Sequence, residues 1–81
     1  MDVDNLIEMA NRIGEFFDSM PDRAEAVDGV AEHIHRFWEP RMRLAILAAL
    51  DNPEASASME PIVREALSLH KADLQPKTAP A

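Results

Sequence analysis

The sequence predicts an all-α protein, a small open bundle of three to four helices followed by a disordered C-terminal tail. Apolar residues return every three or four positions, the runs of Val, Ile and Thr that are typical of strands are missing, and the chain has only two glycines. Its 81 residues are enough for one small domain. We expect the helical domain at residues 1–72 and the flexible tail at residues 73–81.

The first helix is expected over about residues 4–18. Asp2 or Asp4 is the candidate N-cap, because a short carboxylate side chain accepts hydrogen bonds from the free backbone N–H groups of a first helical turn. The charged side chains lie mostly opposite an apolar stripe, as expected for a helix with one buried face. The stripe consists of Leu6, Met9, Ala10, Ile13, Phe16, Phe17 and Met20.

A second helix is expected over about residues 21–38. Ser19 can cap it, and Pro21 suits its first turn, because proline lacks the backbone N–H that stays unpaired there. Gly29 lies inside this helix, where glycine costs about 1 kcal/mol relative to alanine. A glycine tolerated at this position indicates the close approach of another helix.

Prolines separate the remaining elements. Pro40 disfavours helical geometry at the residue before it, so a third helix is expected to start there and to span about residues 40–51. Residues 52–58 form a small polar connection. Ser58 is the expected cap of a fourth helix over about residues 59–71, and the end of the chain carries too little apolar surface to pack.

Composition and charge exclude several classes of function. Fifteen acidic residues against eight basic ones give a net charge of −7, the wrong sign for a protein that binds nucleic acid phosphates. The chain has no cysteine, so it offers no thiolate for a disulfide, an iron–sulfur cluster or a cysteine-based zinc site. No secretory signal is visible, and the apolar runs are too short for a membrane span. We therefore expect a soluble, cytoplasmic protein.

The residue pattern does not point to catalysis or to a metal centre. His33 and His35 lie about 200° apart around a helix, so they cannot converge on one ion, and His70 has no nearby ligand pattern. The serines fall at expected caps or in the polar connection, and no pair of carboxylates has an enclosed setting. We expect no catalytic residue, no bound cofactor and no metal ligand in this chain.

The segment Ile34–Arg43 is the most informative stretch of the sequence. It gathers Trp, Phe, Met and Arg, the residue types that are enriched at the centres of protein interfaces, around a corner marked by proline. It also holds the main basic concentration, since residues 32–50 contain three arginines and two acids, whereas residues 1–31 contain eight acids and two bases. The candidate interface residues are His33, Arg36, Phe37, Trp38, Pro40, Arg41, Met42 and Arg43.

The residues alone leave two interpretations of this segment open. In the first, Phe37 and Trp38 anchor in a pocket of a partner protein, and the arginines meet carboxylates or carbonyls at its edge. In the second, the two aromatic side chains cap the chain's own core, and the arginines pair with the acidic first helix. The small size of the domain favours a partner, because short helices gain much of their stability from packing.

Three motifs carry a family resemblance. They are the first-helix element at residues 9–17, the Pro21-Asp22 turn, and the segment from His33 to Arg43. With these motifs the chain resembles the delta subunit of soluble, NAD-dependent, molybdenum-containing formate dehydrogenases. The likeness covers about residues 2–50 and, more loosely, the stretch at residues 61–67. His35 departs from the family pattern, which has a basic Arg or Lys at this position.

The resemblance implies a non-catalytic accessory subunit that docks on the catalytic alpha subunit and supports its assembly, stability or molybdenum-cofactor loading. In such complexes formate is oxidised to carbon dioxide and electrons pass to NAD. The alpha subunit carries a molybdenum bis-guanine dinucleotide cofactor and iron–sulfur clusters, and the beta and gamma subunits carry FMN and further clusters. The alternative is a free-standing helical adaptor or chaperone that binds cofactor-maturation proteins transiently. The net charge disfavours a DNA-binding protein.

Overall fold

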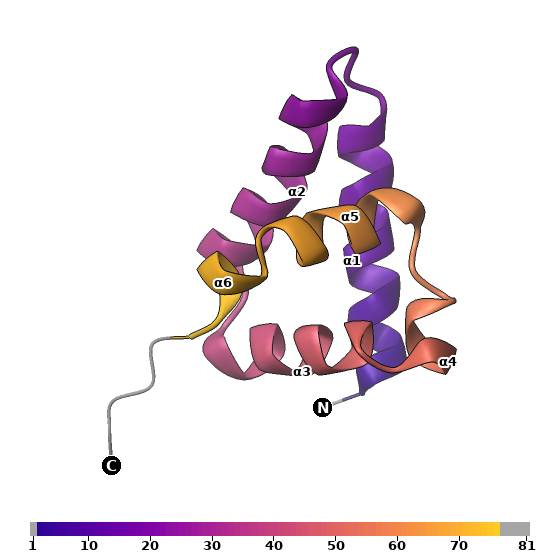
Figure 1. The fold of residues 1–81 in the computed structure, drawn as a ribbon, viewed down its shortest axis with the longest axis vertical. Coiled ribbons are helices and arrows are strands. Elements are labelled where there is room, and N and C mark those ends of the chain that lie inside the picture. The colour runs from indigo at the N-terminus through magenta and orange to yellow at the C-terminus, as the bar shows by residue number, and fades with distance from the viewer. Residues whose placement is uncertain (1, 77–81) are drawn as a thin grey trace.

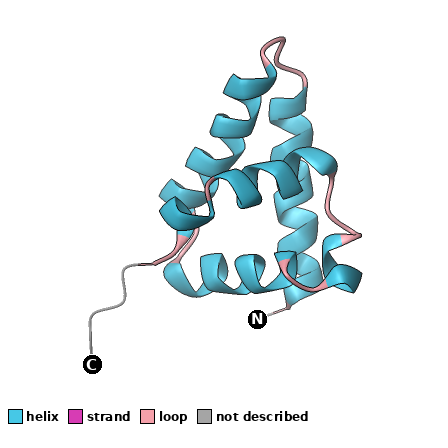
Figure 2. Ribbon diagram, viewed as in Figure 1, coloured by secondary structure: helices cyan, strands magenta, loops and turns pink. Residues whose placement is uncertain are grey.

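Every regular element that the structure describes is a helix (Figure 2). The structure is a computed structural model, and it describes residues 2–76. The helices are α1 (Val3–Asp18), α2 (Arg23–Phe37), α3 (Pro40–Leu50), α4 (Pro53–Ser56), α5 (Pro61–Leu69) and α6 (Lys71–Leu74). The predicted all-α class is confirmed, with α4 and α6 as additional one-turn helices. None of the helices within residues 2–76 is both long enough and apolar enough to cross a membrane.

Helices α1 and α2 form an antiparallel pair that meets at the turn between them and splays apart towards the other end (Figure 1). Helix α5 crosses this pair and contacts both members. Helix α3 crosses at the open end, where it contacts α1 and α5, and α6 contacts α2 and α5. The α3 and α5 helices therefore cover the side that the splayed pair leaves open.

A single hydrophobic core joins the four longer helices and α6. Among residues 2–76 it contains no buried polar or charged residue. Its members return every three or four positions along each helix, as the apolar periodicity predicts. The buried core consists of Leu6, Ile7, Ala10, Ala26, Val27, Val30, Ala31, Ile34, Trp38, Ile46, Leu47, Ala49, Met59, Ile62, Val63, Ala66, Leu67 and Leu74.

Aspartates cap the first two helices. Asp2 accepts hydrogen bonds from two backbone N–H groups of the first turn of α1, at 3.0 and 3.4 Å. Asp22 caps α2 by accepting a bond from the Glu25 N–H at 3.2 Å, so the predicted Ser19 cap is wrong, and the proline before Asp22 lies in the turn. Ser19 instead ends α1, where its hydroxyl donates to the Phe16 carbonyl at 2.9 Å.

A side chain of α1 holds the backbone that leads into α5. The side-chain oxygen of Asn11 accepts a hydrogen bond from the Glu60 N–H at 2.8 Å, and its amide nitrogen donates to the Ser58 carbonyl at 2.9 Å. Glu60 makes no side-chain bond at this helix start. The predicted Ser58 cap is therefore wrong, because Glu60 occupies the N-cap position of α5 and the Ser58 carbonyl is instead bonded by an amide 47 positions earlier in the chain.

Both glycines mark close approaches. A Cβ atom at Gly14 would lie 2.8 Å from a Val63 methyl group and 2.9 Å from an Ile62 methyl group, so α5 packs directly on α1 at this point. A Cβ atom at Gly29 would lie 2.5 Å from the Phe17 ring. The close approach inferred at Gly29 is confirmed, and the neighbour is an aromatic side chain that fills the space left by the missing Cβ.

The helical fold continues past residue 72. Helix α6 covers Lys71–Leu74, and Leu74 is 1% exposed, so the predicted start of the tail at residue 73 is too early. The reason is that Leu74 meets the core, which the sequence pattern did not show. The predicted connection at residues 52–58 also holds a helix, α4. Residues 77–81 of the predicted tail lie outside the described residues.

Candidate docking surface

The predicted interface segment divides into an inward part and an outward part. Trp38 is 6% exposed and belongs to the core, and Met42 packs against the same core. Phe37 is 70% exposed, and Pro40 is also exposed. The division lies at the end of α2, where the backbone of Trp38, the C-cap, turns from helical to extended. Glu39 is also extended, as expected for the residue before a proline.

The indole of Trp38 therefore covers the chain's own interior. This placement matches the second interpretation of the segment for Trp38, and it leaves the indole unavailable as an anchor in a partner pocket. Phe37 keeps the orientation that docking needs, since its ring points out from the end of α2. Of these two neighbouring aromatic residues, Trp38 is therefore buried and Phe37 is exposed.

Four aromatic rings form a continuous line from α1 to α2, and we call this line the aromatic ridge. Its ring centroids are separated by 5.1, 6.4 and 4.8 Å in order along the line. The two end rings are 72% and 70% exposed, whereas the two inner rings are half-buried. The ridge consists of Phe16, Phe17, His33 and Phe37.

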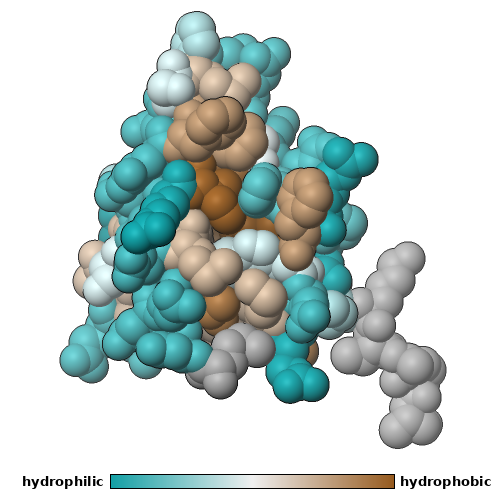
Figure 3. Space-filling view, turned by 180° about the vertical axis from the view of Figure 1, so that it is seen from behind, coloured by the Kyte–Doolittle hydropathy of each residue, from teal (hydrophilic) through white to brown (hydrophobic). Residues whose placement is uncertain are grey.

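Apolar surface is visible from outside the molecule. Seen from behind, one face shows brown and tan patches bordered by hydrophilic surface (Figure 3). Contiguous exposed apolar patches mark sites of interaction, whereas single exposed apolar side chains are common on protein surfaces. The exposed ends of the aromatic ridge therefore make it a candidate docking surface.

The predicted arginines have three different surroundings. Arg36 lies next to Phe37 on α2, and its guanidinium is 3.6 Å from the Glu32 carboxylate of the same helix, with both side chains about two-thirds exposed. Arg41 is exposed and Arg43 is half-buried. Neither of these two forms an ion pair within residues 2–76. The pairing of the arginines with the acidic first helix, which the second interpretation includes, is absent from this part of the chain.

Phe16 is a surface residue, at 72% exposure. The apolar periodicity had placed both Phe16 and Phe17 on the buried stripe of the first helix. Consecutive helical residues point about 100° apart, yet both members of an adjacent pair can be buried, as Leu6 and Ile7 are at 3% exposure each. The spacing of Phe16 and Phe17 alone therefore does not show which of the two is exposed.

Comparison with protein families places these features in a known group. The family model described as the NADH-dependent formate dehydrogenase delta subunit, FdsD, matches residues 5–67. The chain belongs to this family. The matched range includes the whole aromatic ridge and Asn11, and the resemblance inferred from the motifs is confirmed. Searches for similar curated proteins and similar solved structures find no match.

The histidines of this FdsD-family chain lie apart from one another. His33 belongs to the aromatic ridge, whereas His35 is exposed and lines a pocket on another side of α2. His70 lies between two carboxylates, 2.8 Å from Asp28 and 3.4 Å from Asp73, and so ties α6 to α2. Within residues 2–76 there is no group of three or more His, Asp or Glu side chains that could hold a metal ion.

Proposed function

We propose that the chain is a non-catalytic accessory subunit that docks on the catalytic alpha subunit of a cytoplasmic, NAD-dependent formate dehydrogenase. Docking supports the assembly, stability or molybdenum-cofactor loading of that subunit. Membership of the delta-subunit family supports the enzyme context. The aromatic ridge, with its two exposed phenylalanines, is the observation that carries the docking step.

The aromatic ridge favours association because its end rings gain little from the chain's own fold. Phe16 and Phe37 are 72% and 70% exposed. Burying a phenylalanine side chain that was exposed is worth about 1.5–3 kcal/mol. A partner groove that covers both rings therefore gains a binding free energy of several times RT from each ring. Gains of this size are typical of the aromatic anchors that dominate protein interfaces.

The rest of the predicted interface takes two roles in this proposal. Arg36, Pro40 and Arg41 lie on the surface around the corner between α2 and α3, where the arginines can meet carboxylates of the alpha subunit. Trp38 and Met42 act from inside, because their packing on the core holds that corner in place. Docking then depends directly on Phe37 and indirectly on Trp38.

The redox groups belong to the partner subunits in this proposal. The alpha subunit carries molybdenum bis-guanine dinucleotide and iron–sulfur clusters, and the beta and gamma subunits carry FMN and further clusters. The present chain has no cysteine, so it has no thiolate with which to ligate a cluster. In this proposal the chain contributes a contact surface to the complex and no redox group.

The test is to isolate the enzyme from cells that supply only a Phe37→Ser variant of this chain. We expect the wild-type chain to stay stoichiometric with the alpha subunit through size-exclusion chromatography in moderate salt, and the variant to be lost. Enzyme prepared with the variant should contain less molybdenum and reduce less NAD with formate.

A matched control comes from Leu69, which is 68% exposed on α5 and lies outside the aromatic ridge. A Leu69→Ser variant removes a similar amount of exposed apolar surface, and it should remain bound at the wild-type ratio. Retention of the Phe37→Ser chain at that ratio, with normal molybdenum content, would contradict the proposal.

A further inference from the structure

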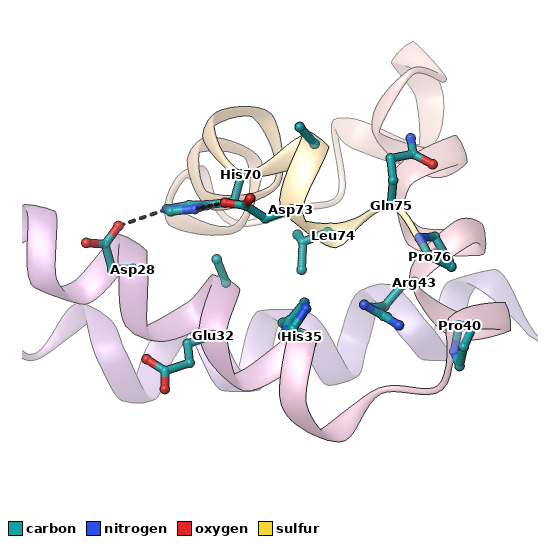
Figure 4. A pocket seen from close by; sticks show the side chains of 12 residues that line it. Asp28, Glu32, His35, Pro40, Arg43, His70, Asp73, Leu74, Gln75 and Pro76 are labelled. Carbon is teal, nitrogen blue, oxygen red and sulfur yellow. Dashed lines mark hydrogen bonds and ion pairs between the residues drawn. The ribbon is translucent and has the colours of Figure 1, made fainter. Parts of the chain in front are cut away.

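We propose that a second surface, the pocket between α2, α3 and the end of α6, receives an acidic side chain from another subunit of the same complex. The pocket has a volume of about 810 Å³ (Figure 4). Its lining includes Glu32, His35, Pro40, Arg43 and Leu74. The inference rests on the proposed function, because it needs a partner subunit, but it uses side chains outside the aromatic ridge.

Arg43 is the unusual residue of this pocket. Its Nε atom is buried and has no hydrogen-bond partner, and the side chain forms no ion pair within the described part of the chain. A guanidinium stays charged at any physiological pH and has five N–H donors and no acceptor. A buried donor without a partner is unfavourable, and the guanidinium has further N–H donors to which a carboxylate entering the pocket would bind.

The pocket's own carboxylates are already engaged. Asp28 and Asp73 lie 2.8 and 3.4 Å from the two ring nitrogens of His70, and Glu32 lies 3.6 Å from Arg36. Each acid therefore has a partner of its own within the described residues, whereas Arg43 forms no ion pair there. A carboxylate that pairs with Arg43 would then come from outside the described residues.

A carboxylate is the group that matches the guanidinium of Arg43. The planar guanidinium donates two parallel hydrogen bonds to the two oxygens of a carboxylate, a geometry that favours Asp or Glu over a neutral acceptor. His35 lines the same space from α2 and offers a second ring N–H donor close to Arg43 (Figure 4). The two side chains come from different helices, so they can contact an incoming acid from two sides.

The size of the pocket favours a polypeptide segment over a small free anion. A volume of 810 Å³ falls in the range of pockets for ligands far larger than formate, which has three non-hydrogen atoms. Its walls also include apolar residues such as Ala31 and Leu74, which an ion alone would leave uncovered. A docked subunit further presents its acidic side chain at high effective concentration, which offsets the repulsion from a chain with net charge −7.

The first test compares Arg43→Met with Arg64→Met in the full-length chain. Arg64 is exposed on α5, forms no ion pair within residues 2–76, and does not line the pocket, so the control removes the same charge. We expect Arg43→Met to raise the dissociation constant of the complex about 30-fold or more, and Arg64→Met to change it about twofold or less. The thermal midpoint of the isolated Arg43→Met chain should equal or exceed that of the wild type, because the buried unpaired N–H is gone.

The second test identifies the occupant. A photo-crosslinking residue at Ala72, an exposed position in the pocket wall, should capture a segment of another subunit that contains Asp or Glu. Changing that acid to its amide should weaken the complex as much as Arg43→Met does, and the double variant should be no weaker than either single variant.

Three results would overturn the inference. They are a wild-type dissociation constant for Arg43→Met, a captured segment without an acidic residue, and saturable binding of millimolar formate or phosphate at Arg43 in the isolated chain. The last result would make the pocket a small-anion site. If wild-type chain binds the complex but Arg43→Met binds equally well, this inference fails while the proposed function stands. If the wild-type chain does not bind at all, the proposed function itself fails.

Discussion

At the scale of single residues, Asn11 shows how much a contact between distant segments can decide. Its amide makes two hydrogen bonds, at 2.8 and 2.9 Å, to the backbone at the start of α5. The same residue lies on the polar side of the first helix in any helical projection. Local sequence rules for caps consider only the few residues before a helix, so they selected Ser58 instead.

An Asn11→Ala variant tests this assignment. It leaves the Glu60 N–H and the Ser58 carbonyl without their partner, so we expect the free energy of unfolding to fall by about 1–2 kcal/mol. Urea denaturation followed by circular dichroism measures it. Asn5→Ala is the control, because the one hydrogen bond that the Asn5 side chain makes within residues 2–76 is a weak one to a methionine sulfur at 3.8 Å. Its effect should stay within about 0.5 kcal/mol. Equal effects of the two variants would remove the special role of Asn11.

Trp38 and Phe16 are two residues whose surroundings differ from those that the sequence suggested. In both cases the difference lies in the direction of a large side chain. The direction of Trp38 depends on how the backbone turns after α2 ends, and that of Phe16 depends on which of two adjacent rings the core accepts. Neither choice is encoded by residue type alone, because Trp and Phe are as common in cores as in interfaces.

At the scale of helices, most of the fold was predictable because periodicity and proline positions are local signals. The expected ranges 4–18, 21–38 and 40–51 correspond to α1, α2 and α3. The end of the chain was less predictable. Helix α6 has only four residues, and its place depends on the contact between His70 and Asp28 and on burial of Leu74.

Leu74 and Leu69 form a matched pair for testing the role of α6. Leu74 is 1% exposed and Leu69 is 68% exposed, although both belong to the same C-terminal region. We expect Leu74→Ala to lower the free energy of unfolding by about 2–4 kcal/mol, because it leaves a cavity in the core. Leu69→Ala should change it by about 0.5 kcal/mol or less. Similar losses for both variants in urea denaturation would mean that α6 does not belong to the core.

At the scale of the whole molecule, the predicted interface segment contributes to two surfaces and not to one. The aromatic ridge lies where α1 packs beside α2, and the Arg43 pocket lies where α2 meets α3 and α6. The continuous segment at residues 33–43 contributes to both. A small subunit built this way can contact a larger protein on two sides of one helix.

Oxidative footprinting of the free chain and of the assembled enzyme tests the central claim most directly. Hydroxyl radicals should oxidise Phe16 and Phe37 in the free chain and leave both protected in the assembly, whereas Trp38 should be protected in both states because it is 6% exposed. Leu69 should react equally in the two states. If Phe16 and Phe37 are oxidised in the assembled enzyme as fast as in the free chain, the aromatic ridge is not the docking surface.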